Sequence, residues 1–352
     1  MAATAACNLD LDAFLTTSGR GDDTLAAAGA VVRRMASAAI EVARIISLGQ
    51  LGGGDSVAVG TGNSAGDAQK KIDVLANASF IDSLQSSPVA AVLTDELVCP
   101  LLLDPAAPLV VAIDPLDSSS NIDAAVSLGT IFSILPAAIK ATRPEDHFLR
   151  PGHDQIAAGF FIYGPQTSLA LTLGDGVHIF TLDRATRLFR LAIPKVSIAQ
   201  GSTEYAVDAS NYRHWDDSVR AYVDDCVTGL EGPLGKDYNM HWVASLVAEA
   251  YRILARGGVY LCPADERRGY GAGRHRLIYE ANPISFLIEQ AGGAATDTVQ
   301  RILDLRPTEL HARTAFVFGS SDVVYRIVRY HTDPQFSAEH EPLFARRGLL
   351  RL

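Results

Sequence analysis

Apolar positions along the chain form either short uninterrupted runs or stripes with a helical period. The run 109–113 contains no polar residue, which is typical of a central strand buried on both faces of a parallel or mixed sheet. Other apolar runs, bounded by glycine, proline or charged turns, predict strands at 89–93, 126–135, 156–163, 168–172, 177–182 and 188–191. The first half of the chain is therefore predicted to be rich in strands.

Stripes with helical spacing predict the helices. In 24–48 the stripe includes Val31 and Met35, Asp23 is a suitable N-cap, and Gly49 is a suitable end. Further helices are expected at 67–77, 239–256, 284–291 and 322–330, alternating in the second half with strands at 205–207, 259–263, 294–298 and 316–319. This order of elements predicts an α/β (layered α+β) fold with two subdomains.

The chain divides into four predicted segments. They are a flexible lead-in at 1–22, an N-terminal metal-site domain at 23–198, a C-terminal substrate-binding domain at 199–335, and a tail at 336–352. The glycine-rich stretch 49–66 lacks the spacing of a dinucleotide-binding fingerprint, so we interpret it as a mobile surface loop.

Composition narrows the possible partners. With 352 residues, 48% hydrophobic content and a net charge of −10, the chain is an ordinary globular protein that is poorly suited to nucleic acid. No apolar run reaches the roughly 18 residues of a membrane span, and the four cysteines lack paired spacing. These features predict reduced thiols, a cytoplasmic location and no membrane partner. An anionic substrate would need local positive charge or a bound metal.

The polar sequence after the run 109–113 carries the strongest chemical signal. Asp114 and Asp117 are separated by Pro115, and three serines at 118–120 follow. Ligands of open α/β sheets bind beyond the carboxyl ends of strands, and paired carboxylates with a free carbonyl suit Mg²⁺ or Mn²⁺. The alternative is an ordinary turn, since Asp, Pro and Ser are common turn residues.

Other charged residues stand at the ends of predicted elements. Asp73 lies on a helix, Asp95 and Glu96 follow a strand, and Glu280 precedes a helix. A solvated helical carboxylate would explain the first, and a favourable helix N-terminus would explain the last. Residues 265–276 form the densest basic patch, which fits either a solvated loop or a phosphate-binding site.

Several motifs resemble those of class I fructose-1,6-bisphosphatases. The sequence from Asp114 to Asp123 is similar to their Asp-Pro-Leu-Asp-Gly-Ser-Ser-Asn-Ile-Asp signature. The segments around Asp73 and Glu280 resemble their Gly-Asp-x-x-Lys-Lys-x-Asp-Val and Tyr-Glu-x-Asn-Pro patterns, in matching order over about 24–330. The resemblance implies a sugar-phosphatase fold, a homotetramer, two or more Mg²⁺ ions per subunit, and hydrolysis of fructose 1,6-bisphosphate to fructose 6-phosphate. It further implies that 49–66 closes over the active site.

The resemblance also implies roles for individual residues. Implied metal ligands are Asp95, Glu96, Asp114, the Leu116 carbonyl, Asp117 and Glu280, with Asp67 peripheral. Asp73 and Glu96 are expected to accept the proton of the attacking water. Implied substrate contacts are Asp117, Ser118, Ser119, Ser120, Asp208, Asn211, His241, Trp242, Cys262, Arg274 and Arg276. Trp242 fits a core aromatic equally well.

Departures from the family pattern concern mainly the substrate side. Asp208, His241, Cys262 and Arg274 stand where Asn, Arg, Tyr and Lys are usual, so sedoheptulose 1,7-bisphosphate is an alternative or second substrate. Asp95 replaces a longer Glu. Ser118 replaces a glycine, and Ser would cost on the order of 1 kcal/mol if φ is positive there.

Two further function classes and one regulatory question stay open at this stage. One class is an inositol-monophosphatase-like enzyme, and the other is a phosphosugar-binding homologue without catalysis. The family's AMP site uses a Lys-Tyr pair and an Arg where this chain has Pro108-Leu109 and Pro136. We therefore expect no inhibition by AMP, and cooperative AMP inhibition in an assay would contradict this.

Overall fold

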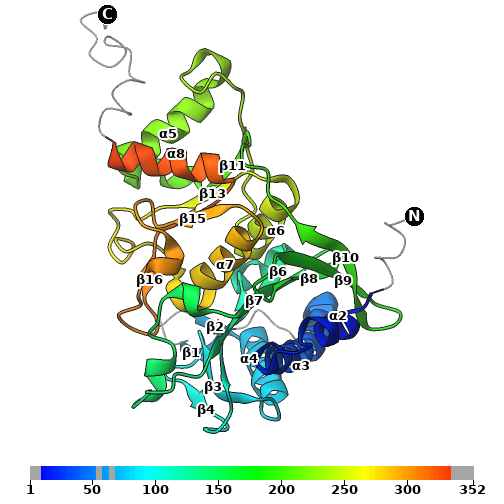
Figure 1. Cartoon of the computed structure of the whole chain (residues 1–352). Helices are drawn as coiled ribbons and strands as arrows, with labels where there is room; N and C mark the ends of the chain where they lie inside the picture. Colours follow the sequence, from blue (N-terminus) through cyan, green and yellow to red (C-terminus); the bar gives the residue numbers. More distant parts are fainter. Residues whose placement is uncertain (1–8, 53–57, 63–67, 334–352) are drawn as a thin grey trace, which may run out of the picture.

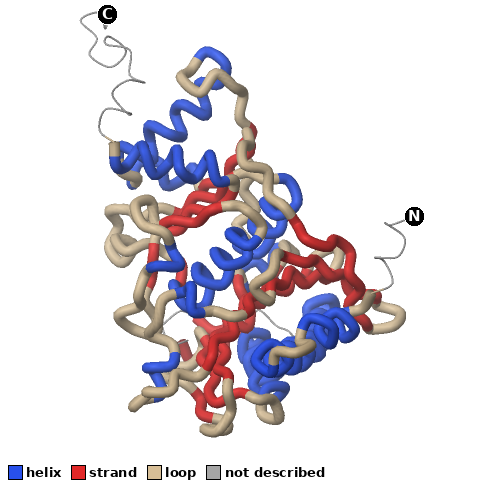
Figure 2. The backbone as a smooth tube through the Cα atoms, viewed as in Figure 1, coloured by secondary structure: helices blue, strands red, loops and turns tan. Residues whose placement is uncertain are grey.

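The computed structural model describes residues 9–52, 58–62 and 68–333 of the chain. Figures 1 and 2 show alternating layers of helix and sheet. The larger sheet has eight strands in the order β10-β9-β8-β7-β6-β5-β3-β4, and the smaller has five in the order β12-β11-β13-β17-β15. Helices cover the outer face of each sheet and fill the space between them, which confirms the predicted α/β fold.

The larger sheet is mixed because one pair of its strands runs parallel. Its strands are β3 (Val89–Thr94), β4 (Leu101–Leu102), β5 (Leu109–Asp117), β6 (Leu128–Pro136), β7 (Ala157–Tyr163), β8 (Thr167–Thr172), β9 (Val177–Asp183) and β10 (Leu188–Val196). Strands β3 and β5 are parallel, whereas β5 to β10 form an antiparallel meander. The carboxyl ends of β3 and β5 therefore lie side by side. Both of these strands were predicted from the sequence.

Three helices cover the outer face of this sheet: α2 (Leu11–Ser18), α3 (Asp23–Leu48) and α4 (Lys71–Leu84). Val111 and Ile113 of β5 pack against them, while Val110 and Ala112 face the other side. Both faces of β5 are thus buried, as its solid apolar run predicted.

The predicted lead-in is wrong over 9–22. Helix α2 begins after Asp10, whose side chain accepts a hydrogen bond from Ala13 N, and Leu15 is fully buried. The helix is eight residues long, too short for a clear apolar period. The cap of α3 is Asp22, one residue before the predicted Asp23.

The smaller sheet separates two pairs of helices. Its strands are β11 (Glu204–Val207), β12 (Asn239–Met240), β13 (Val259–Cys262), β15 (Ala294–Thr296) and β17 (Phe316–Gly319). On one face lie α6 (Leu246–Arg256) and α7 (Asn282–Gln290), between the sheets; on the other lie α5 (Asp217–Thr228) and α8 (Ser321–Thr332). Tyr260 packs toward α6 and α7, whereas Val259 and Leu261 pack toward α5 and α8, as strand alternation requires.

Two helix starts differ from the sequence prediction. Helix α6 begins at Leu246, capped by Ser245, and 239–240 form an edge strand instead. Helix α7 begins at Asn282, two residues before the predicted start at 284, and a π-helical turn (Leu277–Ala281) leads into it. Glu280 therefore sits within a helical turn and not ahead of one.

The remaining strands are short. In the glycine-rich stretch, β1 (Ala58–Gly62) pairs with β2 (Ala68–Lys70), while residues 53–57 and 63–67 lie outside the described part. Strands β14 (His275–Arg276) and β16 (Arg313–Thr314) pair antiparallel. This second pair brings two arginines from distant parts of the sequence to one place.

Candidate active site

A cavity of about 620 Å³ lies where β3 and β5 end. Strand β13, the turn before α7 and the segment before α6 close its other sides. Among the predicted site residues it is lined by Asp73, Asp95, Glu96, Asp114, Leu116, Asp117, Ser118, Ser119, Ser120, Asp208, Trp242, Cys262, Arg274, Arg276 and Glu280. Carboxylates from separate segments thus meet in one place.

The end of β5 holds two carboxylates in fixed positions. Leu116 N donates to Asp114 Oδ1 at 3.0 Å, and Thr130 Oγ1 donates to the Pro115 carbonyl at 2.8 Å. The Asp117 carboxylate accepts a bond from Ser118 Oγ at 2.9 Å. These bonds keep the backbone between the two aspartates rigid.

Ser118 has the left-handed backbone conformation that the glycine of the related motif suggested. Its φ is 64° and its ψ is 30°. This conformation starts the turn Ser119–Ala124, which we call the serine turn, and Ser118, Ser119 and Ser120 line the cavity. A serine at such a position costs on the order of 1 kcal/mol relative to glycine.

Both aspartates of β5 are hard to ionise. Burial, followed by the negative charges of Asp117, Asp95, Glu280 and Glu96, raises the pKa of Asp114 well above its usual range. Burial and the charge of Glu280 raise the pKa of Asp117 to about 6. Like charges crowded in a desolvated place repel each other. We call Asp95, Glu96, Asp114, Asp117 and Glu280 the acidic wall.

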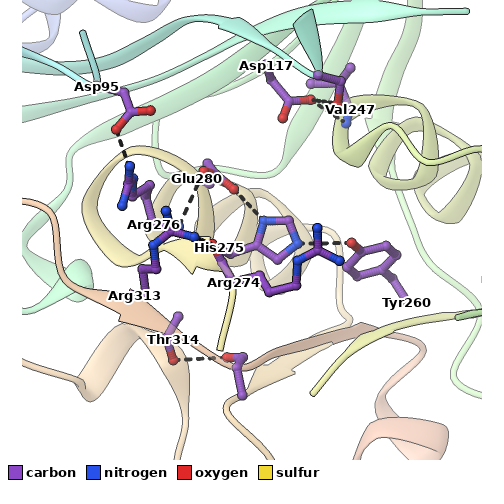
Figure 3. Close-up of polar contacts among 12 residues, drawn as sticks. Asp95, Asp117, Val247, Tyr260, Arg274, His275, Arg276, Glu280, Arg313 and Thr314 are labelled. Atoms are coloured by element: carbon purple, nitrogen blue, oxygen red, sulfur yellow. Dashed lines mark hydrogen bonds and ion pairs between the residues drawn. The ribbon is translucent and has the colours of Figure 1, made fainter. Parts of the chain in front are cut away.

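Two members of the acidic wall are paired with cationic side chains (Figure 3). Arg276, itself buried, donates from Nε to Asp95 Oδ1 at 2.9 Å. Burial opposes ionisation of Asp95, but its hydrogen bond with His311 and the charge of Arg276 outweigh burial and lower its pKa. The backbone N of Asp95 also donates to the Ile113 carbonyl at 3.2 Å, which ties the ends of β3 and β5 together.

Glu280 and a histidine form the second pair. His275 Nδ1 contacts Glu280 Oε2, and His275 Nε2 is 2.9 Å from Tyr260 Oη. Burial disfavours the imidazolium, but the nearby Cys262 and Glu280 outweigh it, so the pKa of His275 is raised. The π-helical turn places Glu280 opposite His275.

The acidic wall fits a divalent cation. Its carboxylate oxygens and the Leu116 carbonyl are hard donors, and mutual repulsion dominates the electrostatics of Asp114 after burial. Among the residues that the structure describes, no three His, Cys, Asp or Glu side chains are already gathered closely enough to form a metal site.

The opposite side of the cavity is cationic. Arg274 lies on the loop 264–274, which we call the basic loop, and its guanidinium carbon is 5.1 Å from the centre of the Tyr270 ring. Asp208 also lines this side, but its carboxylate accepts bonds from Ser210 Oγ at 2.6 Å and Asn211 Nδ2 at 2.9 Å. A carboxylate at this place would repel a phosphate, and the hydrogen bonds that both oxygens of Asp208 accept lessen this repulsion.

Two predicted substrate contacts, Asn211 and His241, do not line the cavity. The Asn211 amide is engaged by Asp208, and His241 lies next to the edge strand β12 with its Nε2 3.8 Å from Glu204. Asp123 does not line the cavity either, because it is exposed on the serine turn. Asp67 lies outside the described residues.

Trp242 is a cavity residue and not part of a core. It is 37% exposed and stacks on Tyr260, with ring centres 6.0 Å apart and an angle of 11° between the rings.

The residues that replace the family's AMP contacts lie at strand ends: Pro108-Leu109 at the start of β5 and Pro136 at the end of β6. The expectation that AMP does not inhibit stays a prediction.

Seven residues that line the cavity were not among the predicted site residues: Asn121, Ala244, Leu246, Tyr260, Tyr270, His275 and Arg313. His275 lies within the basic patch 265–276, between Arg274 and Arg276. Tyr260 and Arg313 carried no such signal, because only the pairing of distant strands brings them to the cavity.

Comparisons with known proteins agree on one family. Models described as the N-terminal and the C-terminal domain of fructose-1-6-bisphosphatase match residues 24–194 and 198–332. The class 1 fructose-1,6-bisphosphatase of Rhizobium meliloti (strain 1021) is 52% identical over 343 residues, covering 97% of this chain and 98% of that protein. That of Rhodopseudomonas palustris (strain BisB5) is 50% identical over 343 residues, covering 97% of each.

Solved structures give the same result. The crystal structure of Leishmania major fructose-1,6-bisphosphatase in holo form has a TM-score of 0.85 at 29% identity, covering 92% of this chain and 99% of that one. Its apo form has a TM-score of 0.80 at 28% identity, with the same coverage. Separately, none of the helices described here is both long and apolar enough to span a bilayer.

Proposed function

Because the chain belongs to the fructose-1,6-bisphosphatase family and is a phosphatase, we propose that it removes the 1-phosphate of fructose 1,6-bisphosphate with the help of Mg²⁺. The products are fructose 6-phosphate and inorganic phosphate, a reaction of gluconeogenesis and of the Calvin cycle. The observation that supports this most is the meeting of the acidic wall and the basic loop at one cavity. A substrate with a phosphate at each end needs both.

The acidic wall is the proposed metal site. Glu96, Asp114, Asp117, Glu280 and the Leu116 carbonyl would hold the ions, with Asp95 at the edge because Arg276 already engages it. When bound, divalent ions polarise the phosphoryl group and lower the pKa of water. The number of ions is open, and Mn²⁺ is an alternative because it accepts the same oxygen donors.

The residues of the chain would act on the substrate as follows. Asp73, which is buried in the first turn of α4, and Glu96 take the proton of the attacking water. The water oxygen would bond to phosphorus as the bond from phosphorus to the sugar oxygen breaks. The sugar oxygen leaves with the electron pair of that bond and takes a proton from water, which gives fructose 6-phosphate and inorganic phosphate. The backbone amides of Ser119 and Ser120, with Arg276, bind the 1-phosphate oxygens as charge builds on them.

The other end of the substrate meets the basic loop. Arg274 would bind the distal phosphate, since an arginine fork matches a phosphate in geometry and charge. Trp242, and Cys262 where the family has a larger residue, would border the sugar. The smaller Cys262 side chain leaves room for a longer sugar, so sedoheptulose 1,7-bisphosphate is a second candidate substrate. A homotetramer in the cytoplasm is proposed on family grounds alone.

Phosphate release from a panel of sugar phosphates tests the proposal. With Mg²⁺, rapid phosphate release is expected from fructose 1,6-bisphosphate. The rate of release from sedoheptulose 1,7-bisphosphate, compared with that rate, shows which of the two substrates the enzyme prefers. Excess chelator should stop both reactions. Release from inositol monophosphate alone would contradict the proposal in favour of a monophosphatase, and binding without turnover would indicate a non-catalytic homologue.

A further inference from the structure

The basic loop contains a tyrosine that contacts two arginines. The guanidinium carbon of Arg267 is 4.6 Å from the centre of the Tyr270 ring, and that of Arg274 is 5.1 Å from it. Both distances are within the range in which a cation is attracted to the face of an aromatic ring. Tyr270 and Arg274 line the cavity, whereas Arg267 does not.

A buried carboxylate anchors one of these arginines. Asp265 accepts bonds from Arg267 Nε at 3.0 Å and from Arg267 Nη2 at 2.5 Å, and it is only 8% exposed. The Arg267 backbone N donates to the same carboxylate at 2.9 Å. Arg267 is therefore a fixed support for the ring.

The backbone of the basic loop is also constrained. Tyr270 N donates to the Arg267 carbonyl at 3.0 Å, and Gly273 N donates to the Tyr270 carbonyl at 2.8 Å. At Gly273 φ is +94°, and a Cβ there would lie 2.1 Å from the backbone of Thr314. Arg313 Nη1 donates to the Arg274 carbonyl at 3.1 Å. The tyrosine and the backbone of Arg274 are thus held relative to each other.

Apart from its contact with the Tyr270 ring, the side chain of Arg274 is the least restrained part of this arrangement. It is exposed, and a free arginine side chain loses much rotamer freedom when it binds a ligand. Contact with an aromatic face restricts it beforehand, so less freedom is lost on binding. A planar ring suits a planar guanidinium in a way that an aliphatic side chain does not.

We propose that Tyr270 is a positioning residue that holds the Arg274 guanidinium ready for the distal phosphate of the substrate, with Asp265 and Arg267 supporting the ring. This inference rests on the proposed function, because it assigns Arg274 to that phosphate. It makes Tyr270 a determinant of affinity for the phosphate that is not removed. It predicts no role for Tyr270 in the bond-breaking step.

Steady-state kinetics of variants that keep or remove the aromatic ring at position 270 test the proposed role of Tyr270. Tyr270→Leu should raise KM for fructose 1,6-bisphosphate about two- to fivefold, the range of an exposed cation–π contact, with kcat unchanged. Tyr270→Phe should keep the KM of the parent enzyme, because it keeps the ring. In the double variant Tyr270→Leu/Arg274→Ala, KM should equal that of Arg274→Ala alone, because the ring acts only through Arg274.

Two matched competitors separate positioning from general loop damage. Tyr270→Leu should weaken inhibition by fructose 6-phosphate, which carries the distal phosphate, and leave inhibition by fructose 1-phosphate unchanged. Arg268→Ala removes a neighbouring exposed charge and should leave the ratio of the two inhibition constants as in the parent enzyme. Equal losses for both competitors, failure of Tyr270→Phe, or additive effects in the double variant would overturn the proposal. A parent enzyme without activity on the bisphosphate would instead overturn the proposed function, and this inference with it.

Discussion

The acidic wall and the basic loop face the same cavity but are built in opposite ways. The wall stands on the ends of β3 and β5 and on a helical turn, and Asp114 and Asp117 are each 8% exposed. The basic loop is a connection between strands, and Arg274 on it is exposed. One side of the cavity is held by the core and the other by contacts within a loop.

The difference separates two electrostatic contributions to the site, that of the acidic wall and that of the basic loop. Burial and like charge make the ionised wall unfavourable in the protein alone, so under the proposed function a cation that neutralises it would bind at the place where bonds change. Arg274 of the basic loop is exposed to solvent. Under the proposed function it would contribute affinity for a part of the substrate that is remote from the reacting phosphate, and it would thereby hold and orient the substrate.

The largest effect is expected when one negative charge is removed from the acidic wall. Asp117→Asn should lower kcat by more than about 100-fold, which exceeds the usual effect of a group that only supports a metal ligand, and Glu280→Ala should do the same. Folding should be intact by circular dichroism. Full turnover in either variant would show that the wall is not the reacting centre.

The same residue should make the metal-free protein sensitive to pH. The folded pKa of Asp117 is about 6 against an ordinary 3.8, so the folded state holds this proton more tightly than the unfolded chain. The resulting stability is complete below about pH 4 and is lost as pH rises through 6, on the order of 3 kcal/mol in all. Thermal melts without metal should show most of this loss between about pH 4 and 6 in the parent protein, and Asp117→Asn should not show it.

On the loop side, Arg274→Ala should act on binding. Loss of a charged hydrogen bond to phosphate is worth about 1.5–3 kcal/mol, so KM should rise roughly 10- to 100-fold while kcat changes little. Steady-state kinetics with fructose 1,6-bisphosphate measure both. A fall in kcat as large as that of Asp117→Asn would erase the distinction between the two sides.

The smallest effect is expected at Ser118, where the wall meets the serine turn. Ser118→Gly should relieve the left-handed strain at φ 64° and stabilise the protein by about 0.5–1 kcal/mol. Loss of the bond from Ser118 Oγ to Asp117 offsets part of this gain. Activity should stay within about twofold, because the serine turn binds through its backbone. A destabilised variant would mean that the side-chain bond outweighs the strain.

The acidic wall was largely predictable from the sequence, and the basic loop was not. A solid apolar run followed by Asp114 and Asp117 is a local signal, since a strand buried on both faces has to be apolar. The contact of Glu280 with His275 depends on a π-helical turn, and the contact of the Arg274 guanidinium with the Tyr270 ring depends on a loop that closes through Gly273. Neither has a periodic pattern.

The predicted element boundaries were wrong where a helix is short or where apolar residues precede the actual N-cap. Helix α2 was missed because two buried leucines in eight residues form no period. The start of α6 was placed too early because 239–245 carries apolar residues, although Ser245 is the actual cap. As a consequence His241 was predicted near a helix start and lies instead beside an edge strand.

Isothermal titration of the chelator-treated protein with Mg²⁺, in the presence of fructose 6-phosphate and inorganic phosphate, tests the central claim most directly. The parent protein should bind Mg²⁺ saturably, and Asp117→Asn should lose that binding while Arg274→Ala keeps it. Indistinguishable isotherms for the parent and Asp117→Asn would contradict the claim that the acidic wall is the cation site.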